Sequence, residues 1–353
     1  MLKLQYFVIL LNLTFLVLMF FRHSWNEDQR INPRYRRLLQ ITTYEKMSFT
    51  SYNRNFPPVD GIPFPEEFIS FLNQWKISDS QYYVDADFTS DDVVFVTYSS
   101  SNHFTEARVA IRELRNIFKN KIIFYNLGLK PAEVSELEKV CNLKVRKFNF
   151  SAYPASVRNL KEYRFKPILI AEVFLETKAF WVIDASIRFR NATKALNDFY
   201  DSVRARKVEQ FVLRHPASHS IYCTTEPIMF HYLPMELQTS KKIRMLEANT
   251  MFVRQSEFAR EAVKWNALCA LTDDCMGPST AKLACNFSGS DRFTISASCH
   301  RFDQSSINII IDSLLERDGR YVDRDSSGPF GAITSIERDT VMKESLDIPC
   351  AKH

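Results

Sequence analysis

Glycine is scarce in this sequence, with only seven in 353 residues. No glycines stand at the spacing G-x-G-x-x-G or G-x-x-x-x-G-K-[ST], two motifs in which glycine lets the backbone pack against phosphate. The G-x-S-x-G turn of the α/β-hydrolases is absent as well. Dinucleotide-binding, P-loop and α/β-hydrolase functions are therefore excluded.

The body of the chain also lacks excess charge of either sign. Residues 1–54 hold eight basic and three acidic residues, and this difference (8 − 3 = 5) equals the net charge of +5 of the whole chain. Non-specific affinity for nucleic acids comes mainly from neutralising phosphates. A body without net charge therefore excludes nucleic acid as a partner.

One long apolar run stands near the N-terminus. Residues 4–21 (LQYFVILLNLTFLVLMFF) carry no charge and would form a helix of roughly 27 Å, enough for a thin bilayer. The following FRHSW lacks the small residues of a cleavage site. We predict a cytoplasmic tail (1–3), an uncleaved signal anchor (4–21), a Pro- and aromatic-rich stem (22–90), a globular domain (91–320) and a C-terminal tail (321–353).

Two observations disagree about the side of the membrane on which the body lies. Five arginines follow the apolar run and only Lys3 precedes it, which by the positive-inside rule favours a cytosolic body. Three N-glycosylation sequons, at Asn149, Asn191 and Asn286, and a cluster of cysteines favour a lumenal body. We predict the lumenal, type II arrangement.

Four of the seven cysteines fall in one polar, loop-like stretch: Cys269, Cys275, Cys285 and Cys299. Their spacing contains no C-x-x-C pair, which argues against zinc, and predicts disulfides whose pairing stays open. An odd number of cysteines leaves at least one unpaired within the chain. We predict that Cys141, at the end of a predicted helix, is a buried free thiol, whereas Cys350 is free or links two chains.

Strand and helix patterns alternate in the first half of the body. Short apolar runs predict strands at 93–98, 121–129, 143–150 and 179–184, and helical spacing of apolar residues predicts helices at 103–118, 131–140 and 165–176. Continuous apolar runs are typical of parallel strands buried on both faces. The sequence therefore predicts an α/β fold with a mostly parallel central sheet flanked by helices.

Charged residues follow the last of these strands, in FWVIDASIRFR (180–190). Asp184 either belongs to a functional site or caps the turn after a core strand. Arg188 and Arg190 alternate with apolar residues and would then lie on a solvated strand face, and Lys166, next to a proline at a helix start, would be a surface lysine.

A second polar group stands in HRFDQSSINIII (300–311). A helical stripe of isoleucines follows, and Asp303 stands just before it, where an N-cap residue belongs. His300, beside a cysteine, is either a structural histidine or a ligand or base.

The segments KIIFYNLGL, YRFKPILIAEVFLE, FWVIDASIRF and CHRFDQSSINIII resemble an uncharacterised family, abundant in nematodes, of single-span proteins with a nucleotide-diphospho-sugar transferase pattern. The order of anchor, stem and cysteine-bearing body resembles Golgi glycosyltransferases of the glycosyltransferase-A type. The similarity runs from about residue 93 to about residue 315.

This resemblance implies a donor site. Asp184 takes the first position of a D-x-D turn that holds Mn²⁺ or Mg²⁺ against the diphosphate of a nucleotide sugar, and Ser186 stands in place of the second acid. A hydroxyl brings no charge, so Lys166 and Arg188 are candidates to stabilise the leaving diphosphate.

The later segment would act on the sugars. By the same resemblance, Asp303 and Gln304 would be catalytic, and His300 would supply a metal ligand or a base. The implied protein is a type II transferase of the Golgi or endoplasmic reticulum membrane that moves a sugar to a glycan or glycoprotein. The alternatives are an inactive ectodomain of the same fold that binds glycans or proteins, and a purely structural ectodomain.

Overall fold

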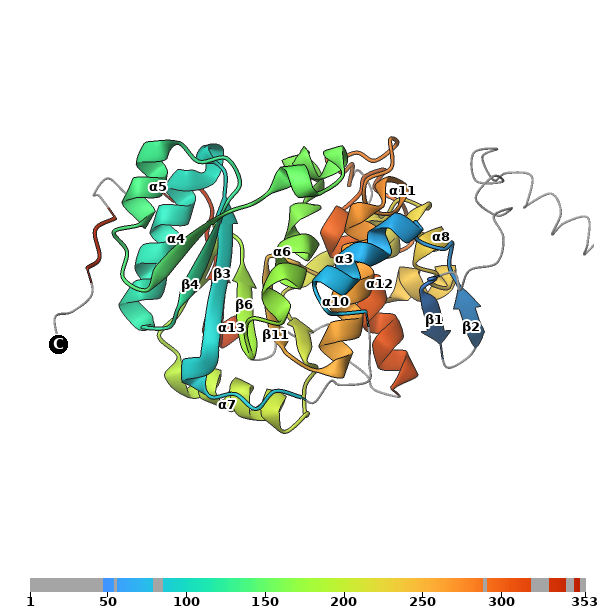
Figure 1. Ribbon diagram of the computed structural model, residues 1–353. Helices are drawn as coiled ribbons and strands as arrows, with labels where there is room; N and C mark the ends of the chain where they lie inside the picture. The colour runs from blue at the N-terminus through green and yellow to red at the C-terminus, as the bar shows by residue number, and fades with distance from the viewer. Residues whose placement is uncertain are drawn as a thin grey trace, which may run out of the picture. The chain divides into compact units, whose positions relative to one another are not determined.

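In the computed structural model a six-stranded sheet runs through the centre of the body, in the order β5-β4-β3-β6-β11-β8 (Figure 1). The strands are β3 (Val93–Ser99), β4 (Ile122–Asn126), β5 (Leu143–Lys147), β6 (Ala179–Ile183), β8 (Phe211–Leu213) and β11 (Thr250–Arg254). The pairs β5–β4, β4–β3 and β3–β6 are parallel, whereas β11 is antiparallel to both β6 and β8. The predicted α/β class with a mostly parallel sheet is confirmed.

The structure describes residues 47–53, 56–78, 85–287, 291–318, 330–340 and 346–349. The predicted tail (1–3) and anchor (4–21) lie outside this set. Within it, no helix is both long enough and apolar enough to cross a bilayer.

Helices cover both faces of the sheet. The longer ones are α4 (Phe104–Ile117), α5 (Pro131–Leu137), α6 (Phe165–Phe174), α7 (Thr193–Arg204), α10 (Glu257–Leu271) and α12 (Phe302–Arg317). The short ones are α3 (Ile69–Gln74), α8 (Met229–Tyr232), α9 (Leu237–Lys242), α11 (Asp273–Met276) and α13 (Phe330–Ile333). The predicted helices at 103–118, 131–140 and 165–176 are thus confirmed.

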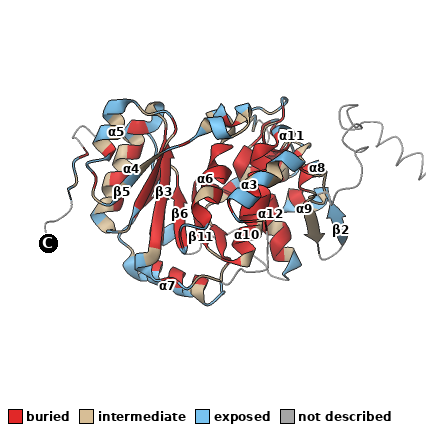
Figure 2. Ribbon diagram, viewed as in Figure 1, coloured by how far each residue is buried: buried red, intermediate tan, exposed pale blue. Residues whose placement is uncertain are grey.

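Alternation of side chains along each strand divides the core in two. Phe95, Trp181 and Phe252 point to the face covered by α4, α7 and α13, which we call the α7 face. Val96 and Val182 point to the opposite face, covered by α6, α10 and α12, which we call the α6 face. Figure 2 shows that the central strands and the helices of the α6 face are almost wholly buried.

Part of the predicted stem belongs to the body. The compact unit begins at Met47 rather than at residue 91. A hairpin of β1 (Thr50–Asn53) and β2 (Phe56–Asp60) precedes α3, and Phe49, Phe64 and Leu72 are buried in the core of the α6 face. Local composition did not reveal this docking, because the apolar partners lie on α10 and α12.

The predicted C-terminal tail is also partly built into the body. β12 (Thr334–Ile336) pairs with β7 (Ile187–Phe189), and Phe330 and Leu346 are buried in the core of the α7 face. A second small pair joins β9 (Pro216–Ser220) to β10 (Arg244–Leu246). The body therefore continues past residue 320.

The cysteines of the polar stretch pair with each other, as Cys269–Cys275 and Cys285–Cys299. The predicted free thiol is wrong, because Cys141 forms a disulfide with a partner outside the described residues. The backbone N–H of Cys141 donates to Ile348 O at 2.7 Å, so the C-terminal segment runs beside it. Cys223 is the free, buried cysteine among the described residues.

Candidate functional site

Polar residues from four elements meet where the parallel strands end. Tyr98 stands near the end of β3, and Asp184 follows the last residue of β6. Lys166 lies in the first turn of α6, and Asp303 lies in the first turn of α12. In open α/β sheets the carboxyl ends of the strands are the usual place for a ligand.

The ammonium group of Lys166 is the centre of this cluster. Its Nζ lies 3.2 Å from Asp184 Oδ1 and 2.9 Å from Asp303 Oδ2, and it donates to the carbonyl of Ala248 at 3.0 Å. Of these contacts, the one to Ala248 O is a hydrogen bond and the two to the carboxylates are ion pairs, and Asp303 Oδ2 is buried without a hydrogen-bond partner among the described residues. The interpretation as a surface lysine is wrong, since only 4% of the side chain is exposed.

Burial and mutual attraction set the charge states. Burial alone would lower the pKa of Lys166, but the carboxylates of Asp184 and Asp303 outweigh it and raise the pKa well above its ordinary value. Burial, and then the charge of Asp184, raise the pKa of Tyr98 well above 10. Burial raises the pKa of Asp303, although Lys166 opposes this. At neutral pH Lys166 is therefore charged, and Tyr98 keeps its proton.

Asp184 is held through one of its two oxygens. The hydroxyl of Tyr98 donates to Oδ1, the oxygen that also faces Lys166, while the backbone N–H of Asp184 donates to Asn249 O at 2.9 Å. Among the described residues nothing bonds to Oδ2, and 28% of the side chain is exposed. Asp184 is thus a fixed carboxylate with an oxygen left to accept from a ligand.

The sequence did not point to Glu247 and Asn249, which lie between β10 and β11. Asn249 Nδ2 donates to Glu247 Oε2 at 2.6 Å, and Asn249 Oδ1 is buried without a hydrogen-bond partner in the part of the chain that is described. Burial raises the pKa of Glu247. The antiparallel direction of β11 brings its first residue to this edge. The only local signal is the presence of two polar residues, Glu247 and Asn249, just before an apolar strand.

Arg301 and Arg338 stand near the same cluster. Both lower the pKa of Glu247, against the opposing effect of Asp184. Arg301 precedes α12, and Arg338 follows β12. Neither guanidinium has a hydrogen bond or an ion pair within the described ranges, so both are available to an anion.

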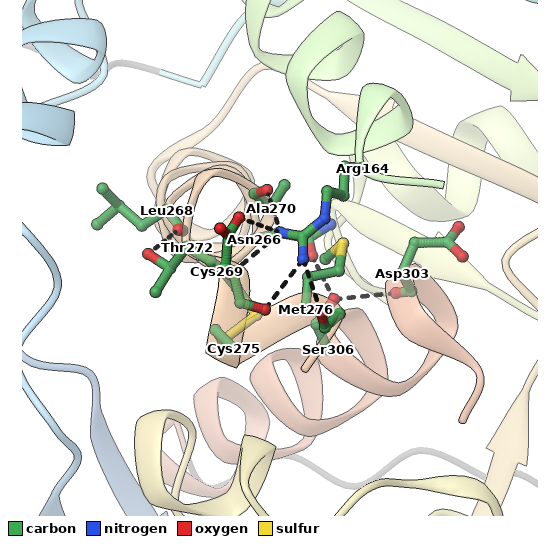
Figure 3. Close-up of a disulfide and its surroundings, with 12 residues drawn as sticks. Arg164, Asn266, Leu268, Cys269, Ala270, Thr272, Cys275, Met276, Asp303 and Ser306 are labelled. Carbon is green, nitrogen blue, oxygen red and sulfur yellow. Dashed lines mark hydrogen bonds and ion pairs between the residues drawn. A yellow bond between two sulfur atoms is a disulfide. The ribbon is translucent and has the colours of Figure 1, made fainter. Parts of the chain in front are cut away.

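Arg164 anchors the start of α6. It is fully buried and donates to the carbonyls of Ala270 (2.9 Å), Thr272 (3.1 Å), Asp273 (2.9 Å) and Gly277 (3.2 Å). These carbonyls belong to the end of α10, to the loop that the Cys269–Cys275 disulfide closes (Figure 3), and to Gly277 just after that loop. A Cβ on Gly277 would lie 2.6 Å from Arg164 Nη2, so the close approach requires glycine.

Helix α12 is tied to α10 in the same region. The hydroxyl of Ser306 donates to Asn266 Oδ1 at 2.6 Å, and its oxygen lies 3.1 Å from the backbone oxygen of Asp303. In Figure 3 the carboxylate of Asp303 points away from the disulfide. α10 therefore fixes the first turns of both helices that carry the cluster.

Asp303 is not the N-cap residue that the sequence predicted. The helix begins at Phe302, whose φ of 36° is in the left-handed region, and Arg301 is the N-cap. This puts Asp303 inside the first turn, where its carboxylate meets Lys166. Gln304 is half-buried in the same turn.

Arg188 lies apart from the cluster, on the strand that follows Asp184. It is 2% exposed, donates to Ala185 O at 2.6 Å, and its Nε lies 3.4 Å from Glu113 Oε2 on α4. The expected solvated face is wrong for Arg188, because β12 covers this strand; Arg190 is exposed. Ser186 is buried, and its carbonyl accepts from Glu337 N at 2.8 Å.

His300 is fully buried and both of its ring nitrogens are engaged. Nε2 lies 2.9 Å from Met276 O, and Nδ1 accepts from the backbone N–H of Glu226 at 3.2 Å. Burial lowers the pKa of His300 to about 4. The ring is therefore neutral at pH 7 and has no lone pair left for a metal.

The donor set does not fit a divalent ion. Over the described ranges, no three side chains of His, Cys, Asp or Glu are grouped to hold a metal. Asp184 Oδ1 and Asp303 Oδ2 both lie next to the ammonium group of Lys166. Of the two metal ligands that the resemblance implied, Asp184 faces a side-chain cation and His300 bonds to backbone groups.

Comparisons with known proteins give one family and several distant structures. A family model described as a protein of unknown function, DUF1647, matches residues 60–171, less than half of the chain. The search of curated proteins found no match.

Among solved structures, the galactosyltransferase LgtC with donor and acceptor sugar analogues is 10% identical, with a TM-score of 0.31, over 49% of this chain and 63% of that one. This chain thus spans less than two thirds of LgtC. Core-mannan synthase A from Aspergillus fumigatus, in its Mn/GDP form, is 8% identical, with a TM-score of 0.38, over 78% and 86%. The mannosyltransferase Ktr4p from S. cerevisiae, in complex with GDP, is 9% identical, with a TM-score of 0.39, over 73% and 78%. Because these TM-scores lie below 0.5, we infer function from the site itself.

Proposed function

We propose that this chain is a glycosyltransferase-like protein that binds a nucleotide sugar at the edge where β3 and β6 end, and transfers the sugar to a glycan or glycoprotein. The observation that carries the proposal is Asp184, fixed through Oδ1 by Tyr98 and Lys166 and partly exposed. A preorganised carboxylate can accept hydrogen bonds from sugar hydroxyls without the cost of ordering it.

The other residues of the cluster have different proposed roles. Arg301 and Arg338 supply positive charge for a diphosphate, which the N-terminus of α12 also favours. Asp303 is 8% exposed and pairs with Lys166, so it positions that ammonium. Gln304, beside it, is the candidate contact for a sugar hydroxyl.

An oxidising compartment suits this protein. The described residues include two complete disulfides and a further disulfide-bonded cysteine, and such bonds persist in the secretory pathway. Asn149, Asn191 and Asn286 are all exposed. With the apolar run at 4–21, these features support a type II protein of the Golgi or endoplasmic reticulum membrane with a lumenal body.

The test is turnover by the full chain made in eukaryotic cells and offered a panel of nucleotide sugars. We expect release of the nucleotide from at least one donor, and at least a hundredfold loss of that rate in Asp184→Asn. Asp198→Asn, an exposed aspartate on α7, is the matched control and should keep the rate. If no donor is either bound or consumed, the proposal fails.

A second candidate is a binding ectodomain without turnover. The observation that favours it is that Asp303, which the resemblance implied to be catalytic, is nearly buried and paired with Lys166, so its carboxylate is turned to the ammonium rather than to an acceptor. Binding to a glycan array without nucleotide release, unchanged in Asp184→Asn, would support this candidate.

A further inference from the structure

The pair Asp184 and Asp303 forms a cation site that the chain fills with its own side chain. The two carboxylates approach one Nζ at 3.2 and 2.9 Å, and the same Nζ donates to Ala248 O at 3.0 Å. Two carboxylate oxygens and a carbonyl oxygen are also the ligand types that Mg²⁺ and Mn²⁺ take. The site thus has the types of ligand that bind a divalent ion, but these ligands surround the monovalent ammonium group of Lys166.

Lys166 cannot easily withdraw from this position. It is 4% exposed, and Arg164, two residues before it, is bound to four carbonyl groups. The rings of Tyr98 and Tyr163 lie with their centroids 5.7 and 5.3 Å from Nζ, which adds cation–π attraction. Displacing the ammonium would leave a buried charge without partners, which is strongly destabilising.

The sequence around Asp184 agrees with this arrangement. Ser186 occupies the place where a second acid would add negative charge, and Ser186 is buried. A divalent ion beside Lys166 would add two positive charges next to an ammonium. Charge balance therefore favours either Lys166 or a divalent ion, and the chain holds Lys166.

We propose that Lys166 is the resident cation of this site, and that the protein binds a nucleotide diphosphate there without a divalent ion. The first half of the proposal concerns the chain alone, whereas the second rests on the proposed function. Arg301 and Arg338 would contact the phosphates in place of a metal. The backbone pairing of Glu337 N with Ser186 O, at 2.8 Å, brings Arg338 beside the turn that follows Asp184.

Metal binding by the full chain tests the first half. We expect that Mn²⁺, followed by electron paramagnetic resonance and by thermal unfolding, does not bind at Asp184 in the wild type, and that EDTA leaves Tm unchanged. Lys166→Met leaves two facing carboxylates, so its Tm should fall, and Mn²⁺ should restore part of it and bind at least tenfold more tightly than to the wild type.

The control is the double variant Lys166→Met/Asp303→Asn, which removes one charge of each sign. It should regain stability relative to Lys166→Met without binding Mn²⁺. If the wild type binds one Mn²⁺ per chain and Asp184→Asn loses it, the proposal is overturned. This measurement on the wild type decides the matter even where Lys166→Met does not fold.

Nucleotide binding tests the second half. UDP and GDP are titrated into the wild type with EDTA and with Mn²⁺, and Kd of the nucleotide that binds should agree within twofold between the two conditions. Arg301→Gln and Arg338→Gln should each weaken binding about tenfold. A requirement for Mn²⁺ would contradict this half. Failure of both nucleotides to bind would count against the proposed function and leave the Mn²⁺ result standing.

Discussion

The two faces of the central sheet are built from different chemistry. On the α7 face, Trp181 contacts the rings of Phe189, Phe199, Phe252 and Phe330 at centroid distances of 5.3, 5.5, 5.0 and 5.3 Å. Its indole N–H donates to Tyr200 at 2.9 Å. Apolar contacts of this kind are non-directional and need no particular partner.

The α7 face buries one such charged group in Arg188, beside Glu113 of α4, whereas the α6 face buries several charged and hydrogen-bonding groups. Arg164, Lys166, His300 and Asn308 are each almost wholly buried, and each bonds to groups far away in the sequence. A buried polar group without its partner costs free energy, so this face tolerates fewer arrangements. The candidate site therefore lies on the face whose packing depends more on particular hydrogen-bond partners.

The largest expected effect tests the apolar side. Trp181→Ala should lower the free energy of unfolding by about 3–5 kcal/mol, because a fully buried ring is lost and a cavity remains. Urea unfolding measures it, and the exposed Leu175→Ala is the control. A loss below about 1 kcal/mol would mean that the aromatic cluster does not carry the α7 face.

The next effect concerns the buried imidazole of the α6 side. Burial lowers the pKa of His300 to about 4, from 6.5 in the unfolded chain, so the folded state resists protonation. The stability that His300 provides is therefore present above pH 6.5 and is lost as the pH falls toward 4, by about 3 kcal/mol.

Unfolding measured from pH 7 to pH 4 checks this slope. His300→Gln should be less stable at pH 7 but should lack the His300 part of the pH dependence. The exposed His231→Gln should keep the wild-type slope. An equal slope in His300→Gln would show that the acid sensitivity has another source.

The smallest effect compares two tyrosine hydroxyls, one on each side. Tyr98→Phe removes a donor to Asp184, and Tyr200→Phe leaves the indole N–H of Trp181 without its acceptor. Each should cost about 1–2 kcal/mol. Only Tyr98→Phe should also weaken nucleotide binding, which isothermal titration detects. Equal binding losses in both variants would remove the distinction between the faces.

Several parts of the molecule could be predicted from local pattern. The strands and helices between residues 93 and 183 follow from short apolar runs and from helical spacing, because neighbouring residues determine both. The position of Asp184 at the end of a core strand followed as well. So did the presence of disulfides at the four clustered cysteines, although not which cysteine joins which.

Other features depended on residues distant in sequence. Local pattern suggested that Lys166 is a surface residue and that Asp303 is a helix cap. Both interpretations failed because the contact between the two residues joins α6 to α12 across the end of the sheet. Glu247 reached the site through the antiparallel direction of β11. The docking of Phe49 and Phe64 on the body, and the disulfide of Cys141, likewise required partners that no local window contains.

By itself the sequence determined which segments of the first half of the body form strands and helices, since backbone preference and apolar periodicity act over a few residues. Only the tertiary structure decided that one ammonium group would lie between two carboxylates. That arrangement depends on three helix and strand ends meeting at one point, and the free energy of a buried charge depends on everything that surrounds it.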